Sequence, residues 1–140
     1  MVLEIVKDVE VLSQKSIPFD IDSKEDQELL WHMIDTAEAH KENCVGLAAI
    51  QVGVPKRAIL VRHGDTFVPY INPVIIKKDG GCYTTREGCL SLDGERTVKR
   101  YNYIKLMWTT QSGKKKVQMF NGFTAEVIQH EVDHCNGILI

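Results

Sequence analysis

Two histidines and a glutamate near the end of the chain have the types and spacing of a hydrolytic metal site. Residues Gln129–Ile140 read QHEVDHCNGILI, with His130 and His134 four apart. On a helix this spacing places both imidazoles on one face, one turn apart, where they can share a metal ion. Glu131 between them has the position of a general base that acts on a water activated by such an ion. A third ligand is still needed.

The positions after the second histidine offer no such ligand. In the longer zinc-protease pattern a glycine and then a third histidine follow. Gly137 is in register with that pattern, but the place of the histidine is taken by Ile140, which has no lone pair. The sequence also contains no glutamate beyond His134. We therefore expect the third ligand to lie upstream.

The upstream candidates differ in their surroundings. Cys135 points about 100° around the helix from the histidine face, and Cys82 follows two glycines, as a small buried side chain would. Cys89 follows Gly88, which permits unusual backbone geometry and a close approach of the chain. From the residues alone we favour Cys89 over Cys82. The full set, besides carboxylates, is Cys44, His63, Cys82, Cys89 and Cys135.

Composition limits the class of protein. With 140 residues, we expect a single domain, 1–140, around one core. The net charge of −2 does not indicate the basic surface that a nucleic-acid-binding protein needs. Charges interrupt residues 1–15 every few positions, which predicts neither a signal peptide nor a membrane span. Four cysteines without a secretory signal predict a reducing cytoplasm.

The elements that position these residues are predicted as α+β. A first helix begins at Ser23 and runs to about His40, with an apolar stripe typical of core. A last helix begins near Thr124 and ends at Asn136-Gly137. Between them we expect short strands with turns at His63–Asp65, Asp79–Gly81 and Ser112-Gly113. The strands are Arg57–Arg62, Val68–Tyr70, Val74–Lys78, Arg96–Arg100, Ile104–Thr109 and Lys116–Phe120.

These elements give a specific architecture. Antiparallel β-sheets pack around the C-terminal metal-binding helix, with a second helix near the N-terminus on the same core. Trp31 and Trp108 are expected in the core rather than as platforms for a substrate.

Three stretches of the chain resemble the three motifs of the peptide deformylase family, in the family's order and over nearly the whole chain. They are Val45–Gly53 (VGLAAIQVG), Glu87–Ser91 (EGCLS) and Gln129–His134 (QHEVDH). The resemblance implies removal of the formyl group from the N-terminal formyl-methionine of newly made proteins, with release of formate. It also implies that Cys89, His130 and His134 hold the metal. That metal would be Fe²⁺, which Zn²⁺, Ni²⁺ or Co²⁺ can replace.

The resemblance assigns further roles. Gln51, through its side-chain amide, and Leu90, through its backbone N–H, would stabilise the oxyanion. The backbone at Gly46 would lie along the bound peptide.

Two further groups are expected near the site. Glu87 and Arg100 would pair and brace the cysteine loop, or else be unrelated surface charges. The methionine pocket would be walled by Phe123, Glu126 and Val127, with the Glu126 carboxylate either at the pocket rim or paired with a surface lysine.

The chain departs from the family pattern in places. Cys44 and Asp93 replace a usual glycine and proline, and a side chain at Cys44 would crowd the peptide path or add an oxidisable thiol. The stretch to Arg100 is one residue shorter than common. With the sequence ending soon after Gly137, docking to the ribosome is doubtful. The alternative functions are a non-catalytic metal-holding paralogue that binds peptide N-termini, and, third, a general metallopeptidase.

Overall fold

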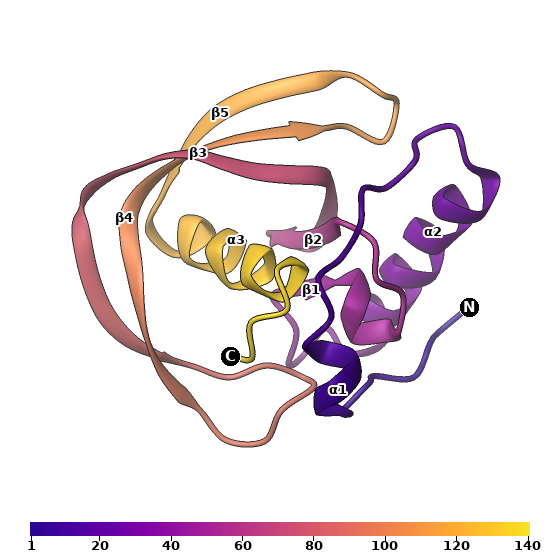
Figure 1. The fold of residues 1–140 in the computed structure, drawn as a ribbon, viewed down its shortest axis with the longest axis horizontal. Coiled ribbons are helices and arrows are strands. Elements are labelled where there is room, and N and C mark those ends of the chain that lie inside the picture. Colours follow the sequence, from indigo (N-terminus) through magenta and orange to yellow (C-terminus); the bar gives the residue numbers. More distant parts are fainter.

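The computed structural model describes residues 1–140, and its elements surround one central helix (Figure 1). The α-helices are α1 (Val9–Leu12), α2 (Lys24–Ala39) and α3 (Gly122–Cys135), and a short 3-10 helix, η1, spans Ala49–Val52. The strands are β1 (Gly46–Ala48), β2 (Ala58–His63), β3 (Thr66–Glu87), β4 (Arg96–Thr109) and β5 (Lys115–Asn121).

The strands form one antiparallel sheet in the order β1-β2-β3-β4-β5. Its long strands curve around α3, as Figure 1 shows. The sheet, the C-terminal helix inside it and the helix near the N-terminus confirm the predicted α+β class. The turns predicted at His63–Asp65 and Ser112-Gly113 are confirmed as the connections β2–β3 and β4–β5.

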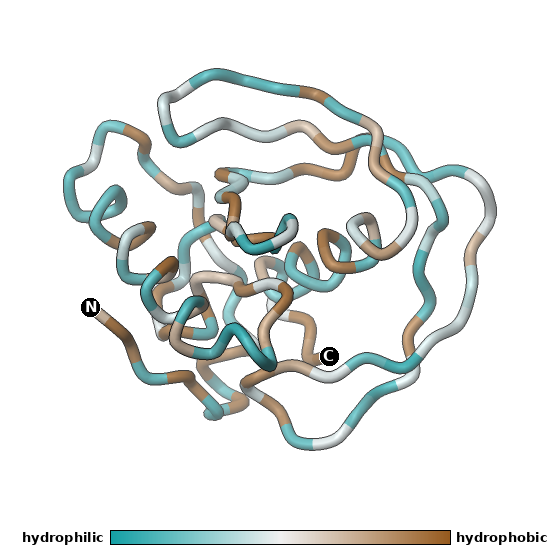
Figure 2. Tube along the Cα trace, turned by 180° about the vertical axis from the view of Figure 1, so that it is seen from behind, coloured by the Kyte–Doolittle hydropathy of each residue, from teal (hydrophilic) through white to brown (hydrophobic).

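Strand β2 lies between two apolar cores, which explains its continuous run of apolar residues. Ile59 and Val61 belong to the core under α3, whereas Ala58 and Leu60 belong to the core under α2. Alternate residues of a strand point to opposite faces, so a strand buried on both faces needs apolar residues throughout. Figure 2 shows hydrophobic segments along the central helix and more hydrophilic segments in the outer parts of the long strands.

The turn predicted at Asp79–Gly81 is wrong. The two strands predicted before it, Val68–Tyr70 and Val74–Lys78, belong to one continuous β3, which runs on through the predicted turn to Glu87. The register shifts between Asp79 and Cys82, with Gly80 and Gly81 at φ 72° and 71°. Paired glycines can therefore make a bulge instead of a reversal, because the partner strand β4 continues past them.

Two smaller expectations also need correction, and one short helix was missed. Trp31 is 58% exposed on α2, so only Trp108 is in the core. Cys82 is exposed rather than buried. The short helix α1, capped by Asp8, was not predicted. By contrast, α2 begins as expected, with the Ser23 side chain accepting a hydrogen bond from the Asp26 N–H.

None of the helices combines the length and hydrophobicity of a membrane-spanning segment.

Candidate active site

Helix α3 holds the site because it is fastened to the sheet beside its histidines. The Gln129 side chain donates from Nε2 to the Tyr101 carbonyl (3.0 Å) and accepts at Oε1 from the Tyr101 N–H (2.8 Å). A side-chain amide that satisfies both backbone groups of one residue fixes the rotation of the helix against β4. The next residue, His130, is thereby aimed at the interior.

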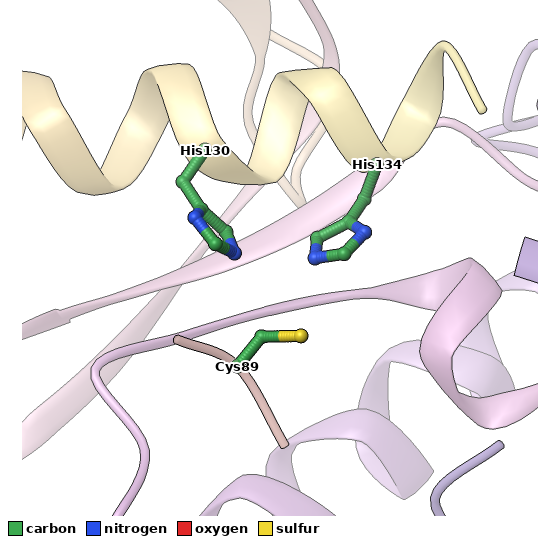
Figure 3. A group of neighbouring side chains, drawn as sticks. All are labelled: Cys89, His130 and His134. Atoms are coloured by element: carbon green, nitrogen blue, oxygen red, sulfur yellow. The ribbon is translucent and has the colours of Figure 1, made fainter. Parts of the chain in front are cut away.

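Cys89, His130 and His134 point toward one another (Figure 3). Their possible ligand atoms, one sulfur and two ring nitrogens, all lie within 4.8 Å of each other. The histidines come from α3, and Cys89 comes from the loop between β3 and β4, about 40 residues away in sequence.

The other upstream candidates lie elsewhere. His63 bonds through Nε2 to the Tyr70 hydroxyl (2.8 Å). Cys135 is buried in the core under α3, and Cys44 in the core under α2. Of the candidates compared, only Cys89 is brought to the two histidines.

The residues fit a metal ion. Both ring nitrogens of His134 are buried and have no hydrogen-bond partner, and neither does Oε1 of Glu131. Buried polar atoms without partners are costly, and native structures rarely leave them so. A thiolate and two imidazoles are also ligands that Zn²⁺, Fe²⁺ and related ions accept. An ion held by Cys89 and the two histidines would give a partner to the His134 ring nitrogen that faces the cluster.

A chain of charged groups orients His130. Its Nδ1 lies 2.7 Å from Oε1 of Glu87, so the opposite ring nitrogen, Nε2, is left for an ion. Arg100 donates two hydrogen bonds to Glu87 (2.9 and 2.7 Å) and one to Asp133 (2.7 Å). The predicted Glu87–Arg100 pair is confirmed. The sequence analysis did not include Asp133 as a partner of Arg100. Its position three residues after His130, on the same side of the helix, could have indicated it.

The same contacts set the charge of each group. Burial opposes ionisation of Glu87, but hydrogen bonds from His130 and Arg100 lower its pKa to about 2. Burial also opposes a charged His130, yet its hydrogen bonds to Cys89 and Glu87 raise its pKa to about 10. An ion at Nε2 would displace the proton from that nitrogen. Burial and the charge of His130 lower the pKa of His134 to about 3, which keeps its imidazole neutral.

The Cys89 thiol is biased toward the thiolate. Burial acts against the charged form, but hydrogen bonds from His130 and from the backbone of Leu92 and Ser91 lower its pKa. The thiolate is the form that binds metals. The loop therefore prepares the sulfur for an ion before one arrives.

Glu131 is packed against the bare backbone of Gly46. A Cβ atom at position 46 would lie 2.7 Å from Glu131 Oε2 and 2.8 Å from Val127 Cγ1, which only glycine avoids. Burial raises the pKa of Glu131 to about 7, partly offset by the charge of His130. A carboxylate with a pKa near neutrality is well matched to proton transfer at neutral pH.

Gln51 connects the glycine motif to the cysteine loop. It lies on η1 with 1% of its surface exposed. Its Oε1 accepts from the Ala48 N–H (3.0 Å), and its Nε2 donates to the Ser91 hydroxyl (3.2 Å). One amide hydrogen remains for another acceptor. Leu90, between Cys89 and Ser91, is half-buried and lines the cavity described next.

A cavity of about 200 Å³ opens beside this cluster. Val127 is buried in its wall, whereas Phe123 is 61% exposed and stands at its mouth. Glu126 also lines it and forms no ion pair with a lysine; its Oε1 accepts instead from the Tyr83 hydroxyl (2.9 Å). The lysine pairing considered for Glu126 is therefore wrong, and Tyr83 was missed. The lining includes Gly46, Glu87, Cys89, Leu90, Phe123, Glu126, Val127, His130 and Glu131.

Cys44 does not crowd this cavity, contrary to expectation. Its side chain is 2% exposed and packs in the core under α2. Its thiol donates to the carbonyl of Gly46 (3.2 Å), and burial raises its pKa to about 12. A side chain is accommodated here because it turns beneath β1, away from the open side.

Comparison with known proteins identifies the relatives of this chain. Residues 2–140 match the model of a family described as polypeptide deformylase. A peptide deformylase of Clostridium beijerinckii is 48% identical over 140 residues, covering 100% of both chains. One from Desulfitobacterium hafniense is 39% identical, covering 93% of this chain and 85% of the relative.

Solved structures agree with these relatives. Peptide deformylase from Thermotoga maritima superposes with a TM-score of 0.89 at 30% identity, covering 99% of this chain and 95% of that one. A class I type b peptide deformylase from Acinetobacter baumannii, bound to Met-Ala-Ser, gives 0.88 at 32% identity, covering 99% and 97%.

Proposed function

This chain belongs to the peptide deformylase family and is a metal-dependent deformylase; from that premise we propose which residues perform each step on N-terminal formyl-methionine. The formyl group is hydrolysed from the methionine nitrogen and leaves as formate. The observation that best supports the residue assignment is the convergence of Cys89, His130 and His134 beside the buried carboxylate of Glu131.

Cys89, His130 and His134 would hold the ion, with Glu87 fixing the His130 ring from behind. When bound, the ion would lower the pKa of a water molecule and polarise the formyl carbonyl. Holding the ion from three sides leaves room for that water, as catalytic sites require.

Glu131 acts as the general base. It takes the proton of the attacking water as the C–O bond forms at the formyl carbon. It then hands this proton to the methionine nitrogen as the C–N bond breaks, so that the amine leaves neutral. Its close packing against Gly46 restricts the carboxylate to the position where both transfers are possible.

The oxyanion that develops during attack needs hydrogen-bond donors. We assign these to the free amide hydrogen of Gln51 and the backbone N–H of Leu90. The bond from Gln51 to Ser91 supports this assignment, because it holds the amide against the loop that carries Leu90.

The peptide would bind along the open edge of β1. The Val45 carbonyl accepts from the Arg62 N–H (2.9 Å), so the backbone groups of the next residue, Gly46, point away from β2. An extended peptide can add to this edge as a further strand. The methionine side chain would then enter the cavity beside Phe123, Glu126 and Val127.

We propose Fe²⁺ as the native metal, with Zn²⁺, Ni²⁺ or Co²⁺ able to replace it, and the cytoplasm as the place of action on nascent chains. A thiolate bound to ferrous iron is prone to oxidation. The iron-loaded enzyme should therefore lose activity in air faster than the nickel-loaded enzyme. Equal lifetimes in aerated buffer would contradict iron as the vulnerable element.

The test of function is formate release from formyl-Met-Ala by freshly purified, iron-loaded protein. We expect multiple turnovers with one formate and one free amine per peptide. Binding of the peptide without formate would instead indicate a metal-holding paralogue. Cleavage of the Met–Ala bond would indicate a general metallopeptidase.

A further inference from the structure

The backbone of Gln51 is held by a residue from the beginning of the chain. The Val6 N–H donates to the Gln51 carbonyl (2.7 Å). Gln51 lies on η1, a helix of only four residues, and the last carbonyls of a helix have no partner within it. All four residues of η1 are buried, so a carbonyl there without a partner would be costly. Val6 supplies the donor that Gln51 needs.

The segment that carries Val6 is fastened to α2 at its other end. Residues 1–8 form no helix or strand and run from beside α2 to α1 (Figure 1). The Leu3 N–H donates to Oγ1 of Thr36 on α2 (2.8 Å). The side chains of Leu3 and Ile5 pack against the core under α2. The segment Leu3–Val6, which we call the N-terminal strap, therefore ties η1 to α2.

The strap also contacts the turn that ends η1. Gly53 makes this turn with φ 86°, and a Cβ atom there would lie 3.5 Å from Val6 Cγ2, so the Val6 side chain covers the turn. On the inner side, the Gln51 amide bonds to Ala48 and Ser91. Because the side chain moves with its backbone, a shift of η1 would displace the amide hydrogen that remains free.

We propose that Val6 is a positioning residue for the oxyanion donor, acting through its N–H on the backbone of Gln51. This inference rests on the proposed function, in which the Gln51 amide stabilises the oxyanion. Removal of such a donor costs about 100- to 1,000-fold in kcat. A donor that is present but loosely held should cost part of this, about ten-fold. Because the oxyanion exists only during the reaction, KM should change little.

Val6→Pro tests the contact, because proline has no N–H to donate. With formyl-Met-Ala and iron-loaded protein, we expect kcat to fall about ten-fold while KM and the metal content stay as in wild type. Lys7→Pro is the matched control, since Lys7 is exposed and its N–H bonds to no backbone carbonyl. It should keep the wild-type kcat and KM.

Thr36→Val tests the other end of the strap with a smaller change. Valine keeps the shape of the buried threonine but cannot accept the hydrogen bond from Leu3. We expect kcat to fall about three-fold, because the strap stays in place but is held less firmly. This variant also supplies the test if Val6→Pro does not fold.

A double-mutant cycle separates positioning from a general loss of structure. Gln51→Ala removes the amide, so Val6→Pro and Thr36→Val should lower kcat no further in that background. Their effect on the unfolding temperature should persist there, because it does not depend on the amide. A merely structural role of the strap would lower kcat by the same factor in both backgrounds.

The outcomes distinguish this inference from the proposed function. The inference is wrong if Val6→Pro keeps the wild-type kcat, or if its loss of kcat recurs in full in Gln51→Ala. A wild-type kcat in Gln51→Ala would also overturn it, since no donor would then need positioning. Where Val6→Pro does not fold, the same criteria apply to Thr36→Val. If the wild type releases no formate, the proposed function itself fails.

Discussion

Burial controls the chemistry of single side chains in this site. Glu131, His130 and His134 are each at most 6% exposed, and burial raises the pKa of Glu131 to about 7. A carboxyl group that water surrounded would stay near its usual pKa and be a weaker base at neutral pH. The helix thus supplies both the position of Glu131 and its basicity.

The role of Glu131 can be tested by Glu131→Gln. The amide keeps the size of the side chain but cannot accept a proton at neutral pH. We expect turnover to fall by about two to four orders of magnitude while the metal stays bound. Glu95→Gln, at an exposed carboxylate, is the control. Activity within a few-fold of wild type would exclude Glu131 as the base.

The third ligand can be tested by metal content. Cys89→Ala should lose the ion or hold it far more weakly, because only two histidines remain. Cys82→Ala and Cys135→Ala should retain it, since one side chain is exposed and the other lies in the core. Elemental analysis of the purified variants decides the matter: loss that follows Cys82 instead would mean that Cys89 is not the ligand.

The glycine beside the base can be tested by Gly46→Ala. The new methyl group would meet Glu131 and Val127 at less than van der Waals distance, so the base must move. A displacement of about 1 Å at a catalytic group can cost on the order of 100-fold in rate. We expect kcat/KM to fall at least ten-fold with the circular dichroism spectrum unchanged. Gly64→Ala, where no atom lies within 4 Å, should keep full activity.

At the scale of elements, α3 is held at its end as well as beside its histidines. Gly137 follows the helix with φ 74°, and a Cβ atom at this position would clash with the backbone carbonyl of Ser13, after α1. The N–H of Ser16 donates to the Cys135 carbonyl (2.9 Å), so the N-terminal segment closes the end of the helix. These contacts keep His134 in register with Cys89.

Gly137→Ala should therefore destabilise the fold strongly. The left-handed conformation costs an L-residue about 1–2 kcal/mol, and the clash with backbone adds about 1–3 kcal/mol. Chemical denaturation should show a loss of roughly 2–5 kcal/mol in unfolding free energy. The control is Gly64→Ala, which has φ 62° but open space around it. Equal losses of unfolding free energy in the two variants would show that the contact with Ser13 does not contribute to the destabilisation.

At the scale of the whole molecule, the site joins parts of the chain that folding must bring together. All four cysteines are free, so no disulfide crosslinks the two cores. An ion held by Cys89 and α3 would tie the β3–β4 loop to the central helix. A ligand that binds only the folded state stabilises it according to its concentration and affinity.

Removal of the metal should accordingly lower the unfolding temperature. At a free ion concentration about 1,000 times the dissociation constant, the ion contributes about 4 kcal/mol. Calorimetry with and without a chelator measures this difference. In Cys89→Ala the chelator should have little effect, whereas in Cys82→Ala it should act as in wild type. A wild-type transition that does not respond to the chelator would contradict a structural link through the ion.

The sequence by itself determined the features that depend on local periodicity. The spacing of His130 and His134 placed them on one helix face, and the capping residue Ser23 marked the start of α2. The turns at His63–Asp65 and Ser112-Gly113 followed from residues that favour reversal. These signals are local, because a helix or a tight turn is decided within a few residues.

Only the tertiary structure decided the contacts between distant residues. The residues alone favoured Cys89 over Cys82 as the third ligand and the resemblance implied it, but only the fold brings the Cys89 sulfur to the two histidines. Tyr83 meets Glu126 because a bulge after Asp79 shifts the register of β3 against β4. Trp31 lies outside the core because α2 turns another face inward. The reason is that each pairing depends on strand register and helix packing, which no short window of sequence contains.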